Sequence, residues 1–545
     1  MEKFKERLMQ FGSALRKHID WIGIAIGLLF VLWLVYDLAR TRLIELSTAG
    51  ILLGAGAVLA ALAYLFFRYF GSDFKGRLVG WLLIVLMVLT SVFGIGLSDQ
   101  VTACLQRLAW HEKMFTEEIG VYTYAQAPVQ DLNRKDLELS VGILEGTNEN
   151  LNNYAIDQLR EGGARIKVQS YGSIQQMMRA LKGQSIQLLL LEPFQVSLAR
   201  EYPDLEKADR ELKKLTSYQY ETSLTDSPKP VDIENESYSV LITSSVDPLS
   251  EQSYRTYQCM VAVVNPKSQR ILLIHIPRNL LIPEVCQDDY ACTPGQNEKV
   301  SLMTYSSQEV LRESVAEWLG TEINYSVRLD MNSLSQLIEK NGSVKVYNPN
   351  YYVTGNTAFN EGEIELNPVM AAIYLNDFND FSEADMQIEN NHLNVLRSML
   401  PFQWIHSLFD MEPVLNTIRD SVQTNFSYND LCEIVKTFIL YPNHWDIQEM
   451  TPVVEDGFDS SSALSGYTYI NGAWGDSQNR IRQAAQALKQ GAEVSTDLSD
   501  IQNQLDEIRA QETEESQEQE DEDAETGQDD PAEQDAEETD SAGEE

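Results

Sequence analysis

Three apolar runs near the N-terminus constrain the fold of this chain more than any other feature. They span residues 21–38, about 49–67 and about 78–97. Each approaches or reaches the ~20 residues that a helix needs to cross the hydrocarbon core of a bilayer. The first run is long for a signal peptide, no small-residue cleavage site follows it, and two further runs come next. We therefore predict three transmembrane helices within residues 21–98, which anchor the chain in the cell membrane.

The distribution of basic residues predicts the orientation of these helices, because cytoplasmic loops carry an excess of Lys and Arg. Such residues precede the first run and separate the second from the third (Lys3, Lys5, Arg7, Arg16 and Lys17; Arg68, Lys75 and Arg77). The loop after the first run holds only Arg40 and Arg42, with Glu45. Residues 1–20 are therefore expected in the cytoplasm, and three crossings place everything after about residue 98 outside the membrane.

The net charge of −41 is concentrated at the C-terminus. Residues 511–545 hold 18 Asp and Glu side chains and no Lys or Arg. Such a segment buries too little apolar surface to offset the entropy of ordering, so we predict an acidic, disordered tail. The acidic balance also argues against nucleic acid as a partner, because phosphate backbones are bound by Lys and Arg.

Strand-like and helix-like segments alternate between residues 137 and 215. LELSVGIL, ARIKVQSY and SIQLLLLEP are typical of strands, and NLNNYAIDQLREGG and IQQMMRALKG of helices. This alternation favours a small α/β accessory domain with a parallel sheet. Residues 99–136 before it and the polar, proline-containing residues 216–236 after it are expected to be linkers.

A second α/β domain is expected at 237–440, with a central sheet flanked by helices. YSVLIT, MVAVVN and ILLIHIP are β-branched runs that fit buried strands, and SQEVLRESVAEWLG is an amphipathic helix that ends at a glycine. Residues 441–475 are aromatic and rich in turn residues. Residues 476–510 carry apolar side chains at mixed three-, four- and six-residue steps, which predicts one or two amphipathic helices and leaves self-association open.

The cysteines and histidines give weaker signals. Cys286 and Cys292 bracket a short polar loop in the predicted extracytoplasmic region, where a local disulfide is one reading. No Cys or His spacing resembles a zinc site. His275 in a strand and His392 in a helix fit satisfied structural roles better than catalytic ones.

A series of short motifs in residues 237–440 resembles the LytR–CpsA–Psr family of bacterial envelope proteins. Each motif is weak alone, but their order and spacing match the family pattern. The matching segments are SSVD at 244–247, RTYQCM at 255–260, VVNP at 263–266, IPRN at 276–279, KVS at 299–301, EWLG at 317–320, NGSV at 341–344, AAIYLND at 371–377, ENN at 389–391 and VQTNFS at 422–427. Longer family members also carry membrane spans and an accessory domain before this region.

The resemblance implies an activity and its partners. Such proteins transfer a phosphorylated glycopolymer from a polyprenyl-pyrophosphate carrier to a hydroxyl group of peptidoglycan, with Mg²⁺ or Mn²⁺. Phosphoryl transfer depends on positioning and on neutralising charge. Arginine suits this task because its planar fork pairs with phosphate oxygens, and carboxylates suit it because they bind hard cations. A groove for the apolar carrier is expected between the sheet and its helices.

The resemblance carries roles to four positions. Arg278 and Arg255 match family arginines and are assigned to catalysis and to binding of the phosphate and the lipid carrier. Asn279 stands where the family has an aspartate and is assigned to phosphate binding. Asp247 takes the first acidic position and is assigned to the metal.

The chain also departs from the family pattern. Tyr257 replaces an aspartate, Ser301 an asparagine, and Asn376, Phe378 and Glu389 replace arginines. We therefore keep two alternatives to catalysis. One is a catalytically degenerate relative that binds lipid-linked glycan or a partner enzyme and regulates wall assembly. The other is a membrane-tethered solute receptor that uses the 137–215 domain.

Overall fold

The fold is described from a computed structural model of the chain. It describes residues 2–70, 74–109, 114–127, 132, 138–145, 147, 149–199, 205, 208–223, 226–245, 255–286, 295–332, 335, 338–339, 342–354, 357–376, 391–395, 398, 416, 419–440, 445–462 and 466–511. The predicted acidic tail, apart from residue 511, lies outside the described residues, as do Asp247, Cys292, Phe378 and Glu389.

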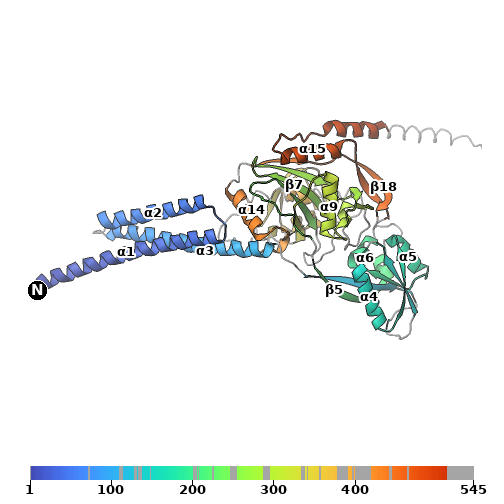
Figure 1. Cartoon of the computed structure of the whole chain (residues 1–545), viewed down its shortest axis with the longest axis horizontal. Helices are drawn as coiled ribbons and strands as arrows, with labels where there is room; N and C mark the ends of the chain where they lie inside the picture. Colours follow the sequence, from blue (N-terminus) through green and yellow to red (C-terminus); the bar gives the residue numbers. More distant parts are fainter. Residues whose placement is uncertain are drawn as a thin grey trace, which may run out of the picture.

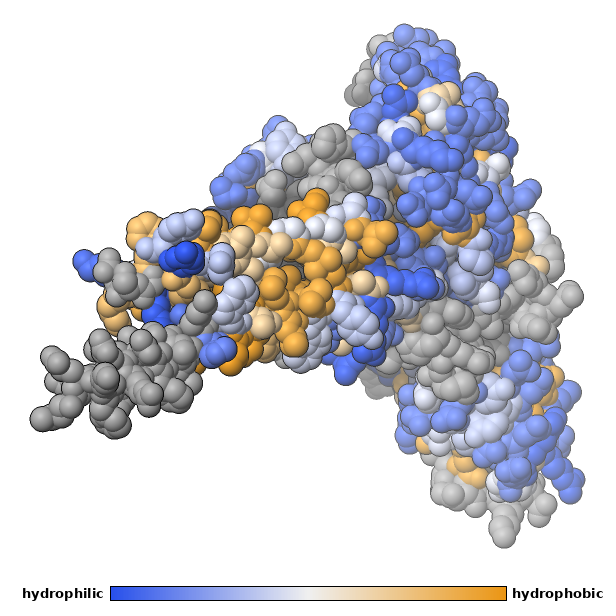
Figure 2. Space-filling view, turned by 60° about the vertical axis from the view of Figure 1, so that its left-hand side comes forward, coloured by the Kyte–Doolittle hydropathy of each residue, from blue (hydrophilic) through white to orange (hydrophobic). Residues whose placement is uncertain are grey.

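The three apolar runs form long helices that lie side by side in a rod (Figure 1): α1 (Glu2–Arg40), α2 (Leu46–Tyr69) and α3 (Phe74–Leu108). Each contains a stretch long and apolar enough to cross a membrane. The rod presents a broad apolar surface, whereas the rest of the molecule is mostly hydrophilic on the face shown in Figure 2. This pattern is expected where lipid is the solvent of the helix surface.

The accessory domain contains a five-stranded sheet in the order β3-β2-β4-β1-β5. Its strands are β1 (Met114–Tyr124), β2 (Glu138–Leu144), β3 (Arg165–Tyr171), β4 (Leu188–Leu191) and β5 (Leu212–Ser223). Strands β2, β3 and β4 are parallel as predicted, and β1 and β5 are antiparallel additions. The helices are α4 (Glu149–Glu161), α5 (Ile174–Lys182), α6 (Pro193–Ala199) and α7 (Ala208–Glu211).

Two predicted boundaries of this domain are wrong. Strand β1 lies in the expected linker 99–136, and β5 extends into the expected linker 216–236. Both strands carry many polar and charged side chains, such as the paired Lys214 and Glu118, so neither shows the apolar run of a buried strand. Their pairing with each other and with β4 stabilises them instead.

The distal domain has a six-stranded mixed sheet in the order β16-β11-β6-β7-β8-β17. Its strands are β6 (Tyr238–Ser245), β7 (Gln258–Asn265), β8 (Arg270–Ile276), β11 (Tyr325–Asp330), β16 (Val422–Thr424) and β17 (Asp446–Met450). Strand β7 is antiparallel to β6 and β8, whereas β11 is parallel to β6 and β17 is parallel to β8.

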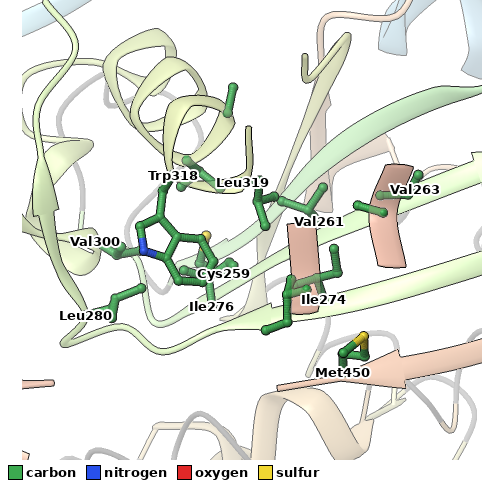
Figure 3. Packing of buried hydrophobic residues seen from close by; sticks show 14 of the residues in the cluster. Cys259, Val261, Val263, Ile274, Ile276, Leu280, Val300, Trp318, Leu319 and Met450 are labelled. Atoms are coloured by element: carbon green, nitrogen blue, oxygen red, sulfur yellow. The ribbon is translucent and has the colours of Figure 1, made fainter. Parts of the chain in front are cut away.

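Helices cover both faces of this sheet. On one face α9 (Gln308–Leu319) and α15 (Ser477–Lys489) bury the main core, in which Trp318 lies over Cys259 and Ile276 (Figure 3). On the other face α14 (Tyr428–Leu440) packs through Leu431 and Ile434. The apolar side chains on both faces explain the uninterrupted hydrophobic runs of β7 and β8.

Smaller elements surround the sheet. They are the hairpin of β9 (Leu281–Pro283) and β10 (Asn297–Lys299), the short helix α8 (Val300–Met303), the pairs β12 (Val344–Asn348) with β15 (Gly362–Leu366) and β13 (Tyr352–Thr354) with β14 (Thr357–Phe359), the helix α11 (Pro368–Asn376), and the hairpin of β18 (Val454–Ser462) and β19 (Gly466–Ala473). Cys286, just after β9, is disulfide-bonded.

The C-terminal segments belong to the distal domain. Residues 441–475, expected as a turn-rich segment, contain β17, β18 and β19. Of the one or two helices expected at 476–510, the structure has two, α15 and residues 499–511. Their apolar side chains, among them Ile481, Leu488 and Ile501, are buried in the main core. Self-association remains a prediction, and this buried stripe no longer supports it.

Candidate functional site

The candidate site lies at one end of the six-stranded sheet. Ser244, near the end of β6, pairs with Gln258, and Ile276 at the end of β8 pairs with Cys259. Because β7 runs antiparallel to both neighbours, the residues just before it meet the residues just after β6 and β8. The segments 255–258 and 277–279 therefore come together, although they are distant in sequence.

Arg255 and Arg278 both approach the ring of Tyr257. The guanidinium carbon of Arg278 lies 4.9 Å from the ring centroid, and that of Arg255 lies 5.9 Å from it. Both distances fall within the range of cation–π attraction. Tyr257 stands where the family pattern has an aspartate, and its ring centroid lies within 5.9 Å of two guanidinium groups. The site therefore gathers positive charge around an aromatic side chain.

The backbone of Arg278 is fixed from two sides. Its carbonyl oxygen accepts a hydrogen bond from the Ser301 amide at 2.8 Å, and the next carbonyl, of Asn279, accepts one from the Asn471 amide at 2.8 Å. The side chain of Arg278 is only 1% exposed. Asn279 is buried beside it, and its role in phosphate binding stays a prediction.

His392 lies beside Tyr257 and Ser244 at this end of the sheet. Its Nδ1 lies 2.8 Å from the hydroxyl of Ser244, and its Nε2 lies 2.9 Å from the carbonyl oxygen of Leu375. A carbonyl can only accept, so Nε2 carries the proton and Nδ1 accepts from Ser244. The ring centroids of His392 and Tyr257 are 6.1 Å apart. The expectation of a satisfied structural histidine agrees with these contacts.

Burial lowers the pKa of His392 to about 4, an effect to which the charge of Arg278 adds and which the hydrogen bond to Leu375 opposes. The imidazole is therefore neutral near pH 7 and does not replace a missing family arginine. An unfolded chain binds more protons than the folded one between about pH 4 and the ordinary histidine pKa of about 6.5.

We predict that the free energy of unfolding falls as pH drops through this window, by up to about 1.4 kcal/mol per pH unit from this one group. Urea unfolding of the wild type and of His392→Gln at several pH values checks this. The variant should lose the part of the pH dependence of the unfolding free energy that His392 contributes. Equal slopes for the wild type and His392→Gln would contradict the assignment.

The part of Gln258 in the site was missed by sequence reasoning, whereas Ser301 was named only as the replacement of a family asparagine. Gln258 is 1% exposed and Ser301 is fully buried. Within the described part of the chain, neither the amide atoms of Gln258 nor the hydroxyl of Ser301 makes a hydrogen bond. A buried polar group without a partner costs about 1–3 kcal/mol, so such groups call for an explanation, and a bound ligand is one. The buried position of Gln258 in a strand gives no hint of this in the sequence.

Replacing Gln258 by Met should separate stability from binding. The apolar side chain removes the cost of burying the amide, so we expect the free energy of unfolding to stay level or rise by about 1 kcal/mol. If the amide contacts substrate, affinity for a polyprenyl pyrophosphate should fall. Gln308→Met is a matched control, because Gln308 in α9 is also buried and its amide also lacks a hydrogen bond in the described structure. A loss of stability without loss of affinity would show that Gln258 is purely structural.

Two further charged residues reach the same end of the sheet from β11. Asp330 pairs in register with Ser245, which stands two residues before Asp247. Arg328 is buried, and its Nη2 lies 3.4 Å from the Ser245 hydroxyl. Sequence reasoning assigned neither residue, because a strand with alternating charges gives no signal of what its end faces.

The described residues alone do not make a metal site. No group of three or more His, Cys, Asp and Glu among them is placed to hold an ion. Asp247, the residue assigned to the metal, lies outside the described part. By register Asp330 is the carboxylate that β11 brings to the sheet end, beside Ser245.

Comparison with known proteins identifies the family. The pattern of the LytR_cpsA_psr family matches residues 206–489, just over half of the chain. The chain belongs to this family. The LytR_cpsA_psr region thus includes the six-stranded sheet, the site and α15.

The chain is also similar to curated relatives and to solved structures. Over 257 residues the chain is 21% identical to a polyisoprenyl-teichoic acid–peptidoglycan teichoic acid transferase TagU of Bacillus mycoides, covering 47% of this chain and 81% of that protein. A TagU of Halalkalibacterium halodurans is 21% identical over 204 residues, which cover 37% of this chain and 65% of that protein. The crystal structure of B. subtilis TagV aligns with a TM-score of 0.38 at 15% identity, covering 48% of this chain and 99% of that one.

Proposed function

We propose that this LytR_cpsA_psr protein attaches a phosphorylated glycopolymer to peptidoglycan from a polyprenyl-pyrophosphate carrier. The observation that carries the proposal is the pair of arginines, Arg255 and Arg278, held on the ring of Tyr257 at the sheet end of a family member. Two guanidinium groups within 5.9 Å of the centroid of one ring suit a ligand with two adjacent phosphates. The names of the TagU relatives, which are teichoic acid transferases, support the same reaction class.

The chemistry proposed for the site is charge neutralisation. A polymer leaves its carrier when a peptidoglycan hydroxyl attacks the phosphorus next to the sugar and the bond to the carrier phosphate breaks. Negative charge grows on the departing phosphate, and Arg278 and Arg255 would stabilise it. A Mg²⁺ or Mn²⁺ ion held by Asp247 would supply further positive charge when bound.

The site would work at the outer face of the membrane. The hydroxyl of Tyr428 donates to the carbonyl oxygen of Thr41 at 3.0 Å, and Arg42 donates to Asn429 at 3.1 Å. These contacts join α14 of the distal domain to the loop between α1 and α2, so both lie on one side of the membrane. The positive-inside bias supports the outer side, where a carrier lipid and peptidoglycan are both within reach.

The experiment is a transfer assay with the full chain in vesicles, a labelled lipid-linked glycopolymer, peptidoglycan and Mg²⁺. The proposal expects label on peptidoglycan and release of polyprenyl phosphate. A second candidate, a non-catalytic relative that binds lipid-linked glycan, is favoured by Tyr257 and Asn279 in place of family aspartates. Saturable binding of the carrier with no transfer under any condition would select that candidate.

A further inference from the structure

The short helix α8 belongs to two hydrophobic cores at once. Val300 and Met303 pack in the main core of the distal domain, where Val300 lies beside Leu280 and Trp318 (Figure 3). Leu302, also fully buried, packs in a core that is otherwise built by the accessory domain. A four-residue helix has little stability of its own, so its position depends on both cores.

Leu302 of α8 packs at the carboxyl ends of the parallel strands of the accessory domain. The core around Leu302 includes Leu144 and Leu191, the last residues of β2 and β4, and Tyr171, the last residue of β3, packs against it. Ligands of open α/β sheets bind outside these carboxyl ends of the strands. Here helix α8 of the distal domain occupies that position, which disfavours the alternative that the accessory domain is a solute receptor.

An aromatic stack completes the contact. The rings of Phe194 in α6 and Tyr305, two residues after α8, are parallel within 9°, with centroids 3.6 Å apart. Figure 1 shows α5 and α6 on the side of the accessory domain nearer to the distal domain. A stacked pair contributes about 0.5–1.5 kcal/mol beyond its buried area.

Helix α8 also touches the arginine site directly through its backbone. The Ser301 amide donates to the carbonyl of Arg278 at 2.8 Å, and the Ser301 carbonyl accepts from the Thr256 amide at 3.0 Å. The hydroxyls of Thr304 and Thr256 lie 3.1 Å apart. Thr256 stands between Arg255 and Tyr257, so α8 fixes both sides of the cation–π arrangement.

We propose that the accessory domain is a positioning module for the arginine site: it holds α8 through Leu302 and Tyr305, and α8 sets the backbone of Arg278 and Thr256. Leu302, Tyr305 and Phe194 are positioning residues, which do not touch substrate. The proposal rests on the proposed function for its effect on phosphate binding, but the docking itself does not.

The test compares Phe194→Ala with Tyr154→Ala in the full chain in nanodiscs. Tyr154 is a matched control, because it pairs with Tyr220 inside the same domain at 5.4 Å, away from α8. Hydrogen exchange is followed in peptides covering 255–258 and 299–306, and affinity is measured for undecaprenyl pyrophosphate. We expect Phe194→Ala to speed exchange at least tenfold in both peptides and to weaken binding about five- to tenfold. Phe194→Tyr should restore both, and Tyr154→Ala should change neither.

Unchanged exchange at 255–258 in Phe194→Ala would overturn the proposal. If that variant does not fold, Tyr305→Leu, which keeps apolar bulk and loses the stack, gives the same comparison with a smaller expected change. If the wild type does not bind undecaprenyl pyrophosphate, the proposed function fails, and the exchange data still decide whether the accessory domain holds α8.

Discussion

Replacing Arg278 by Ala is expected to lower the rate of glycopolymer transfer by about two to four orders of magnitude. A charge-assisted hydrogen bond contributes about 1.5–3 kcal/mol, a forked arginine makes two, and each ~1.4 kcal/mol corresponds to a factor of ten. Arg278→Lys should recover only part of the rate, because lysine keeps the charge and loses the planar fork. Initial rates of the full chain in vesicles give the measurement.

Arg270→Ala is the matched control for this prediction. Arg270 is the first residue of β8, whereas Arg278 lies two residues after the last residue of that strand. Arg270 donates to the carbonyl of Ala492 at 3.2 Å. We expect a rate within about twofold of the wild type. Equal losses in both variants would indicate a general effect on folding, and an undiminished rate in Arg278→Ala would remove the arginine from the reaction.

The largest expected effect on stability comes from Arg312 in α9. This fully buried side chain donates to Asp226 at 2.9 Å, and its other nitrogens donate to the carbonyls of Ile323 at 3.0 Å and Ser227 at 2.9 Å. Asp226 lies in the segment that joins the two domains and also accepts from Ser326. Burial raises the pKa of Asp226, an effect that Arg312 and Ser326 oppose.

Arg312→Met should lower the free energy of unfolding by about 3–5 kcal/mol, because it leaves the Asp226 carboxylate buried without its cation. The double variant Arg312→Met with Asp226→Leu should regain part of this loss, since it removes the two most deeply buried charges and leaves Glu309 and Glu313, which also pair with Arg312, without that cation. Thermal unfolding of the full chain checks both variants. Arg480→Met, which breaks the exposed pair with Asp500, should cost no more than about 1 kcal/mol. A similar small cost for Arg312→Met would contradict the buried-pair account.

Sequence reasoning works here where a pattern is local. The membrane helices, the parallel strands β2 to β4 and the buried strands β6 to β8 follow from apolar runs and alternation that a short window contains. Strands β1, β5 and β17 do not, because polar and charged side chains interrupt their apolar ones and only pairing with their neighbours in the sheet defines them. Helix α8 is too short to predict, and the packing that positions it comes from a different domain.

The residues of the candidate site also fall into two groups, those that a short motif identifies and those that only the three-dimensional structure places there. Arg255 and Arg278 could be named because short motifs resemble a family pattern. Tyr257 was counted as the loss of an aspartate, and its role as the ring between two arginines depends on their approach in three dimensions. Gln258, Arg328 and His392 could be placed in the site only from strand register and from contacts between segments that are separate in the sequence, which no spacing in the sequence expresses.

The most direct test of the account is whether the sheet end recognises pyrophosphate. Equilibrium binding to the full chain in nanodiscs would be compared for undecaprenyl pyrophosphate and uncharged undecaprenol. The account predicts a clear preference of the wild type for the pyrophosphate, which disappears when Arg255 and Arg278 are both replaced by Ala while binding of undecaprenol persists. A wild-type protein that binds the two lipids equally, or a double variant that keeps the preference, would contradict it.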